Sequence, residues 1–218
     1  MQELNFYVIL QKPKITYLLT IIMKQVYKVL ATLLLIVACA ASAYAADFLT
    51  KPLDVQRMEG DANFGFSFPA DSYHDMHARA GLNMGVALRY NIPNSGFDCG
   101  IAADFTGVMR GWDYPGHPEY DMHQTNRILG FSLTGGYNFR QGRKVNPFAE
   151  IGIGVGLYDT VGDRLYDVSG TGVLITPKIG VELWHHLRIY ASSHIIRKGF
   201  NSLDIGIAVT IGGRAKKH

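Results

Sequence analysis

The chain has 218 residues, enough for one domain or a small pair. It is rich in glycine (24 residues), tyrosine (12) and phenylalanine (11), and only 18% of its residues are charged, which is typical of a glycine- and aromatic-rich β protein. The net charge of +3 arises from the first 45 residues, which hold four lysines and one glutamate. The totals of 21 basic and 18 acidic residues therefore leave 17 of each in the remaining chain, so nucleic-acid binding has no electrostatic basis.

The N-terminal segment has the order of parts of a secretory signal peptide. A short basic stretch begins at Met23, an apolar stretch covers residues 29–38, and Ala43-Tyr44-Ala45 offers a small-residue cleavage site. We therefore predict a signal peptide over residues 23–45, preceded by an over-extended reading frame over residues 1–22. The alternative, an uncleaved membrane anchor, needs about 20 apolar residues.

The two cysteines raise a further processing alternative. Cys39 lies within the predicted signal peptide, so cleavage leaves Cys99 as a single thiol without an intrachain disulfide. Residues 36–39 resemble a lipobox, in which cleavage precedes Cys39 and a lipid is attached to it. We predict the ordinary cleavage, with a mature chain that begins near Ala46, because Ala43-Tyr44-Ala45 is a good site of that kind.

Eight segments of the mature chain alternate between apolar and small or polar residues. They cover residues 61–68, 79–92, 97–109, 127–139, 148–158, 172–184, 187–196 and 203–212. In the last of them every odd position from Leu203 to Ile211 is a branched aliphatic, whereas the even positions hold Asp204, glycine, alanine and threonine. Because successive strand side chains point to opposite faces, the pattern predicts a closed sheet with lipid outside and a polar interior.

The connections support this interpretation. Long polar segments (70–78, 110–124 and 159–171) alternate with short turns (93–96, 140–144 and 185–186), as expected of extracellular loops and periplasmic turns. Only the last loop, residues 197–202, is short for its side. Pro177 falls at a lipid-facing strand position and cannot donate a hydrogen bond, so we expect a local bulge there.

Aromatic residues gather at both ends of the predicted strands, as in the interfacial girdles of membrane proteins. The short-turn end holds Tyr90, Phe97, Tyr137, Phe139, Phe148 and Trp184, and the long-loop end holds Phe68, Trp112, Tyr114, Tyr158, Tyr166 and Phe200.

In strand count, alternation and loop asymmetry, the chain resembles the small eight-stranded outer-membrane β-barrels of the OmpA/OmpX type, a porin-like family. The resemblance covers residues 61–213 and implies an all-β, antiparallel, transmembrane up-and-down barrel in the bacterial outer membrane. Residues 46–60 then form a periplasmic segment and residues 214–218 a tail. One feature departs from the family: Ile211 takes the position where the last strand often ends in an aromatic residue that the assembly machinery recognises.

The predicted interior carries many charged side chains, namely Arg89, Lys178, Arg188, Asp98, Asp104, Glu150, Glu182 and Asp204. Two pairs lie across short turns, Glu182 with Arg188 and Arg89 with Asp98. Because buried charges require partners, we predict an ion-paired core that plugs the lumen. A narrow ion path is the alternative.

The strongest catalytic candidates are Ser192, His194 and Asp204, the components of a base-activated serine. Ser192 and His194 share the inward face of one strand, and a symmetric final loop would place Asp204 directly opposite His194. Some barrels of the resembling family are lipid A deacylases, with a serine two residues after a histidine in the penultimate strand; here that position is Ile196. We therefore interpret the three residues as a structural hydrogen-bonding group.

Histidines in the loops raise the question of a metal site. His74, His77, His117 and His123 occur with Asp75, Glu119 and Asp121, ligand types that suit zinc. Their spacing matches no tight ligand motif, so we predict solvated loops with no metal or cofactor. Residues 112–120, with two prolines and three aromatics, are more typical of a contact surface.

The sequence thus predicts a structural or surface-interaction protein without catalytic activity. Its expected partners are outer-membrane lipid and lipopolysaccharide, with an extracellular partner bound through the long loops, and we expect a monomer. A lipid-modifying enzyme and a narrow channel are the alternatives.

Overall fold

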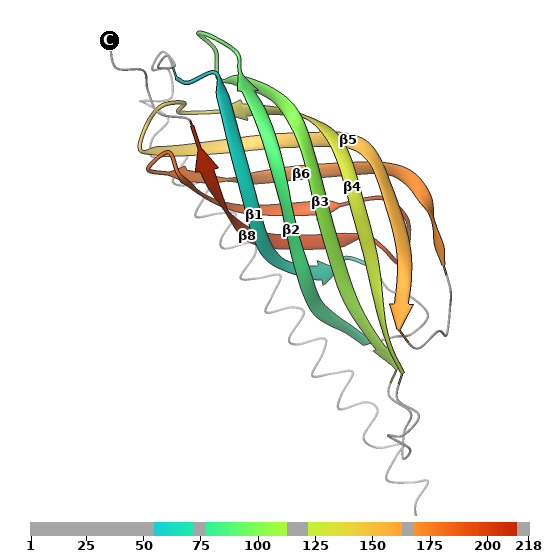
Figure 1. Ribbon diagram of the computed structural model, residues 1–218. Helices are drawn as coiled ribbons and strands as arrows, with labels where there is room; N and C mark the ends of the chain where they lie inside the picture. Colours follow the sequence, from blue (N-terminus) through green and yellow to red (C-terminus); the bar gives the residue numbers. More distant parts are fainter. Residues whose placement is uncertain (1–54, 72–76, 113–121, 163–167, 213–218) are drawn as a thin grey trace, which may run out of the picture. The chain divides into compact units, whose positions relative to one another are not determined.

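The computed structural model describes residues 55–71, 77–112, 122–162 and 168–212. It has eight strands: β1 (Met58–Pro69), β2 (His77–Asn91), β3 (Phe97–Trp112), β4 (Met122–Asn138), β5 (Val145–Gly162), β6 (Ser169–Leu183), β7 (Leu187–His194) and β8 (Ser202–Ile211). Each strand pairs antiparallel with the next, and β8 pairs with β1, so that the sheet closes into a barrel (Figure 1). The predicted eight-stranded antiparallel barrel is confirmed.

Several predictions concern residues beyond these ranges. The predicted signal peptide, Cys39 and the C-terminal tail lie outside the described residues. Within the described residues, no helix is long and apolar enough to cross a membrane.

The two faces of the sheet are those that the alternation predicts. In β8, Ile207 and Val209 are more than half exposed, whereas Asp204 is fully buried and Thr210 is 1% exposed. The same contrast holds around the barrel, where the outward positions form a continuous belt of aliphatic and aromatic side chains. Such a belt is far larger than the apolar patches of soluble monomers, and it suits a lipid environment.

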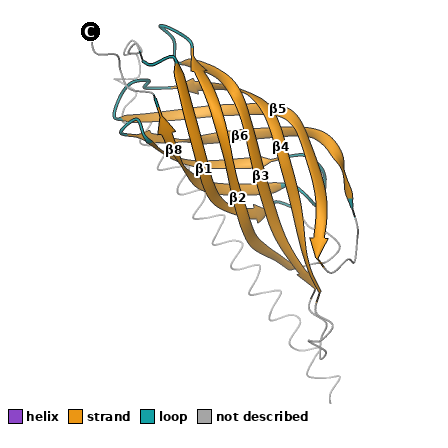
Figure 2. Ribbon diagram, viewed as in Figure 1, coloured by secondary structure: helices purple, strands orange, loops and turns teal. Residues whose placement is uncertain are grey.

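The short turns lie together at one end of the barrel, as Figure 2 shows. At the other end the strands extend further than the sequence predicts: β4 begins at Met122 instead of residue 127, and β5 ends at Gly162 instead of residue 158. Their backbones remain paired, for example Trp112 with Met122. The alternation fades there because the residues are polar, yet the hydrogen-bonded ladder continues.

The predicted bulge at Pro177 is wrong. The pairing of β6 with β7 stops at Lys178 and resumes with Ile175 opposite Ile195 in the same register. Because proline lacks an N–H, the ladder is interrupted there without a shift. A register shift lies instead between Arg79 and Leu82 of β2.

The girdle prediction is wrong for Phe148 and Phe200. Tyr90, Phe97, Tyr137 and Trp184 are exposed at the short-turn end, and Phe68 and Trp112 at the long-loop end. Phe148 instead occupies an inward position of β5 beside Tyr190, and Phe200 is 2% exposed with its ring 4.8 Å from that of Tyr158. Phe148 faces the lumen because the even-numbered positions of β5 point inward, whatever the residue type. Tyr114 and Tyr166 lie outside the described residues.

Candidate functional site

The polar interior of the barrel holds the candidate site, and its contacts fall into three clusters along the axis. The short-turn cluster contains Glu59, Asp61, Arg89, Asn91, Asp98, Asn138, Gln141, Asn146, Glu182 and Arg188. The central cluster contains Asn63, Asn83, Asp104, Thr106, Tyr190, Ser192, His194, Ser202 and Asp204. The long-loop cluster contains Asp71, Arg110, Asn126, Gly199 and Asn201.

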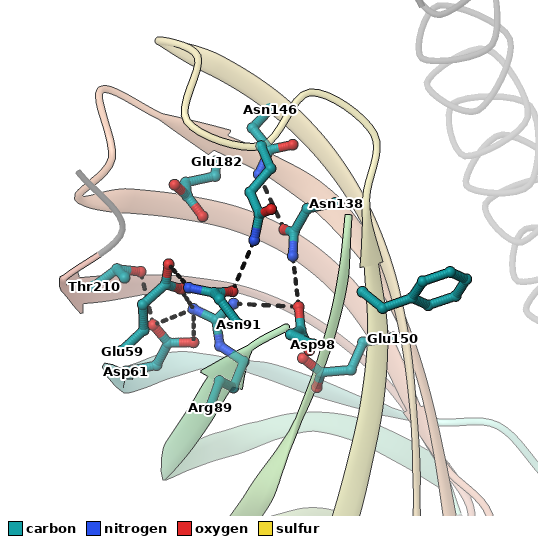
Figure 3. Close-up of polar contacts among 12 residues, drawn as sticks. Glu59, Asp61, Arg89, Asn91, Asp98, Asn138, Asn146, Glu150, Glu182 and Thr210 are labelled. Atoms are coloured by element: carbon teal, nitrogen blue, oxygen red, sulfur yellow. Dashed lines mark hydrogen bonds and ion pairs between the residues drawn. The ribbon is translucent and has the colours of Figure 1, made fainter. Parts of the chain in front are cut away.

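Arg89 is the centre of the short-turn cluster (Figure 3). Its guanidinium is fully buried, and its Nη2 atom lies 2.8 Å from Glu59 and 3.0 Å from Asp61, both on β1. The predicted partner Asp98 is also present, but at 3.9 Å. Sequence reasoning missed Glu59 because β1 begins at Met58, three residues before the predicted strand.

Arg188 provides the second cation of this cluster. It lies directly across the β6–β7 ladder from Glu182, and its Nη2 atom is 2.9 Å from the Glu182 carboxylate, which confirms the predicted pair. Its Nη1 atom is 3.6 Å from Asp61, and its guanidinium lies 4.3 Å from the centre of the Phe148 ring. Because Phe148 points inward, its ring covers the guanidinium of the ion pair between Arg188 and Glu182, a contact that arginine favours with an aromatic face.

Amide side chains connect these charges to the short turns (Figure 3). Asn138 donates to Asp98 at 2.5 Å and accepts from Asn146 at 3.0 Å. Gln141, from the β4–β5 turn, donates to Asn91 of β2 at 3.0 Å, and Asn91 in turn donates to Glu59 at 2.6 Å. These two groups of bonds involve side chains from five strands, β1 to β5, and from one turn at the short-turn end.

Tyr190 joins strands that are not neighbours in the central cluster. Its hydroxyl donates to Asn83 of β2 at 3.0 Å, and Asn63 of β1 accepts from the same hydroxyl at 3.4 Å. Asn83 donates to Thr106 at 2.8 Å. Because β8 and β1 lie between β7 and β2 in the closed strand order, the bond from Tyr190 to Asn83 crosses the lumen instead of joining neighbouring strands.

The structure brings together two of the three catalytic candidates. The His194 Nδ1 atom lies 2.7 Å from a carboxylate oxygen of Asp204, which also accepts a bond from Ser202. The predicted register is wrong by two residues: Ser192 lies opposite Asp204, and His194 lies opposite Ser202. The final loop therefore lies between His194 and Ser202, and within it the Asn201 side chain accepts bonds from the backbone of Ile196 and Arg197.

Ser192 is not bonded to this histidine. The His194 Nε2 atom, which would accept the serine proton in a triad, is buried and has no hydrogen-bond partner among the described residues. A base-activated serine requires its hydroxyl within about 2.6–3.2 Å of that nitrogen. The arrangement therefore lacks the contact that would activate Ser192.

The long-loop cluster joins several segments at the other end of the barrel. Asp71 accepts bonds from Arg110 at 3.0 Å, from the Gly199 backbone at 2.7 Å and from Asn201 at 3.0 Å. The Gly199 carbonyl accepts from Arg110 and from Asn126. The final loop is thereby joined to β3, to β4 and to the end of β1. Sequence reasoning missed this cluster because it joins isolated residues from distant segments.

A small cavity lies beside the charged side chains of the lumen. A cavity lined by Asp61, Lys178, Arg188 and Tyr190, among others, leaves about 10 Å³ for the centre of a water molecule. That volume corresponds to roughly one water molecule.

The loop histidines form no described metal site. His74 and His117, with Asp75, Glu119 and Asp121, lie outside the described residues, as does most of the predicted contact loop. Among the residues that the structure does describe, no three histidine, cysteine or acidic side chains are arranged to hold a metal ion.

Comparisons with known proteins identify the family of the chain. The family model described as "Outer membrane protein beta-barrel domain" matches residues 31–210. Similar solved structures include Neisserial surface protein A (14% identity, TM-score 0.48), which covers 72% of this chain and 97% of that chain. Ail of Yersinia pestis in complex with the heparin analogue sucrose octasulfate (13%, 0.42) covers 72% and 100%, and OprG from Pseudomonas aeruginosa (11%, 0.44) covers 72% and 97%.

No curated protein sequence matches the chain. The family model spans most of the residues, from before β1 to the penultimate residue of β8. The chain therefore belongs to the outer membrane protein β-barrel domain family and is located in the bacterial outer membrane.

Proposed function

We propose that this protein is a closed, monomeric outer-membrane barrel with a structural or surface-interaction role. The observation that carries this proposal is the burial of Arg89 among carboxylates from β1 and β3, in a lumen that is bridged again at Tyr190 and at Asp71. An eight-stranded barrel is just wide enough for its own side chains to fill. Side chains at three levels therefore close the lumen to ions and solutes.

The energetics favour a lumen that stays closed. An ion that entered from the periplasm would have to separate the pairs of Arg89 and Arg188, and loss of one partner from a buried ion pair costs about 3–5 kcal/mol. It would then meet the bonds of Tyr190 and, at the extracellular end, those of Asp71. Because these contacts are on different strands, no single side-chain movement opens the path.

The surface role is assigned to the outside of the barrel. The apolar belt contacts membrane lipid and lipopolysaccharide, and the extracellular segments, including residues 112–120 with their prolines and aromatics, contact an extracellular partner. We also assign residues 23–45 to a signal peptide that is removed during export, which leaves a mature chain beginning near Ala46.

A lipid A deacylase is the second candidate, because a base-activated serine needs a base that a third group orients, and Asp204 is bonded to His194 in this way. Against it, Ser192 is buried, faces the lumen and makes no described bond to His194. Lipid substrates lie on the opposite side of the sheet.

Two assays on the refolded protein test the proposal. In liposome swelling, the wild type is expected to admit no small sugar, and in a lipid A assay followed by mass spectrometry it is expected to release no acyl chain. Swelling would overturn the closed lumen. Acyl release that Ser192→Ala abolishes, without a change in stability, would establish the enzyme instead.

A further inference from the structure

The periplasmic end of the barrel has an uneven distribution of charge. The carboxylates Glu59, Asp61, Asp98, Glu150 and Glu182 all face the lumen, and no described residue of this end is an exposed carboxylate. The exposed charged side chains that the structure describes at this end are cations, namely Arg57, Arg143 and Lys144. We call the surface formed by Arg143, Lys144, Trp184 and His185 the periplasmic rim.

Two neighbouring turns form this rim. The backbone N–H of Trp184 donates to the carbonyl of Lys144 at 2.7 Å, so the β6–β7 turn lies beside the end of the β4–β5 turn. Trp184 is 63% exposed, more than any other aromatic residue of the described barrel. The next residue after Lys144 is Val145, which is 43% exposed at the edge of the apolar belt. The cations therefore lie directly beside the lipid-facing surface, at the level of the headgroups.

The backbone of the β6–β7 turn is unusual for its residues. Trp184 has a φ of 52° and His185 a φ of 66°, in the left-handed region where glycine or asparagine is favoured. A bulky aromatic side chain at such a position is strained, and strain of this kind is concentrated at functional sites. Backbone preference alone would place glycine or asparagine in this turn, yet the turn has an exposed tryptophan.

From this juxtaposition we infer that the periplasmic rim binds net anionic phospholipid headgroups of the periplasmic leaflet. Arg143 and Lys144 supply positive charge for the phosphate, and Trp184 lies at the headgroup level that amphipathic rings prefer. The continuity of the rim with the apolar belt favours a lipid over a soluble anionic partner. The inference is independent of whether the lumen is closed.

Trp184 can itself report the lipids around it, because the chain contains two tryptophans in all. In a Trp112→Phe background, the refolded barrel is placed in phosphatidylcholine vesicles that contain brominated phosphatidylglycerol or, at equal mole fraction, brominated phosphatidylcholine. Quenching of Trp184 fluorescence is compared between the two. Because both leaflets have the same composition, the direction of insertion does not affect the result.

The test variant is Arg143→Gln/Lys144→Gln. The matched control is Arg197→Gln/Lys198→Gln, which removes another exposed, adjacent Arg-Lys pair from the opposite end of the barrel. One cation beside an anionic surface favours that surface by about fivefold. We therefore expect stronger quenching by phosphatidylglycerol in the wild type and in the control, and a ratio close to one in the test variant.

High salt provides a second arm that needs no variant. At about 1 M salt the screening length falls to roughly 3 Å, so the wild-type preference should disappear. Equal quenching by both lipids in the wild type would overturn the inference, as would a preference that the test variant retains. Soluble polyglutamate could also shield Trp184 from quenching by the brominated lipids while the wild type shows no preference between the two lipids. That result would assign the rim to a soluble anionic partner and would overturn the inference.

Discussion

Arg89 of β2 and Glu59 of β1 form an ion pair at 2.8 Å with neither side chain more than 5% exposed. The pair lies next to Asp61 of β1 and Asp98 of β3. The Arg89 guanidinium is therefore shared by carboxylates from the two strands on either side of β2. A second cation, Arg188 of β7, approaches Asp61 from the other side of β8. The charges of the short-turn cluster therefore compensate one another, and removal of Arg89 would take the nearer cation away from Glu59 and Asp61 and the described ion-pair partner away from Asp98.

The first prediction follows from this dependence. Arg89→Met keeps the length of the side chain but removes its charge, and we expect a loss of about 3–5 kcal/mol in the free energy of unfolding, measured by urea titration in liposomes. Arg127→Met is the matched control, because Arg127 pairs with Asp159 while both side chains are about 40% exposed. Such a pair contributes about 0–1 kcal/mol. Similar losses in the two variants would contradict the burial of charge in the lumen.

The second prediction tests the lipid-facing belt. Ile153 and Val161 lie on the same outward face of β5, near its middle and at its extracellular end. Ile153→Arg should cost about 2–4 kcal/mol at the bilayer midplane, whereas Val161→Arg should cost about 0–1 kcal/mol near the interface. The measurement is again urea unfolding in liposomes. An equal cost at the two depths would mean that the assignment of the membrane region is wrong.

A lumen glycine would be a poor control for that experiment. Gly154 faces the lumen, but a Cβ atom added there would collide with the backbone of Phe131. Gly154→Ser is therefore expected to be disruptive in its own right, and Ser132→Ala is the milder lumen substitution.

The third prediction separates a structural role of His194 from a catalytic one. Asp204→Asn keeps the shape and part of the bonding to His194, whereas Asp204→Leu leaves a buried imidazole without its partner, which costs about 1–3 kcal/mol. Stability should fall from wild type through Asn to Leu, with no lipid A turnover in any of the three proteins. Turnover in the wild type that is lost in both variants would reverse this interpretation.

The fourth prediction concerns the extracellular end. Asp71→Ala removes the acceptor for Gly199 and Asn201, so the final loop should open more often. Loss of even about 1.4 kcal/mol raises the open population tenfold, and trypsin cleavage after Arg197 or Lys198 should accelerate accordingly. Asp159→Ala, which removes a carboxylate outside the long-loop cluster, is the control. Unchanged cleavage in Asp71→Ala would show that the cluster does not hold the loop.

Much of the barrel could be predicted from alternation, because strand parity fixes which side chains face lipid and which face the lumen. The pair of Glu182 and Arg188 could be predicted for the same reason, because the short turn between their strands leaves only one register. The position of His194 was not, because the Asn201 side chain shapes the final loop. The long-loop cluster was also beyond the sequence: Asp71 and Gly199 are far apart in the chain, and no local pattern marks their contact.

The measurement that tests the closed lumen most directly is the conductance of the wild-type protein in a planar lipid bilayer, recorded beside a porin as a positive control. We expect no steady current and no discrete openings, because the short-turn, central and long-loop clusters each cross the lumen. Stepwise openings of uniform size in the wild type, absent from protein-free bilayers, would contradict the account and identify the barrel as a channel.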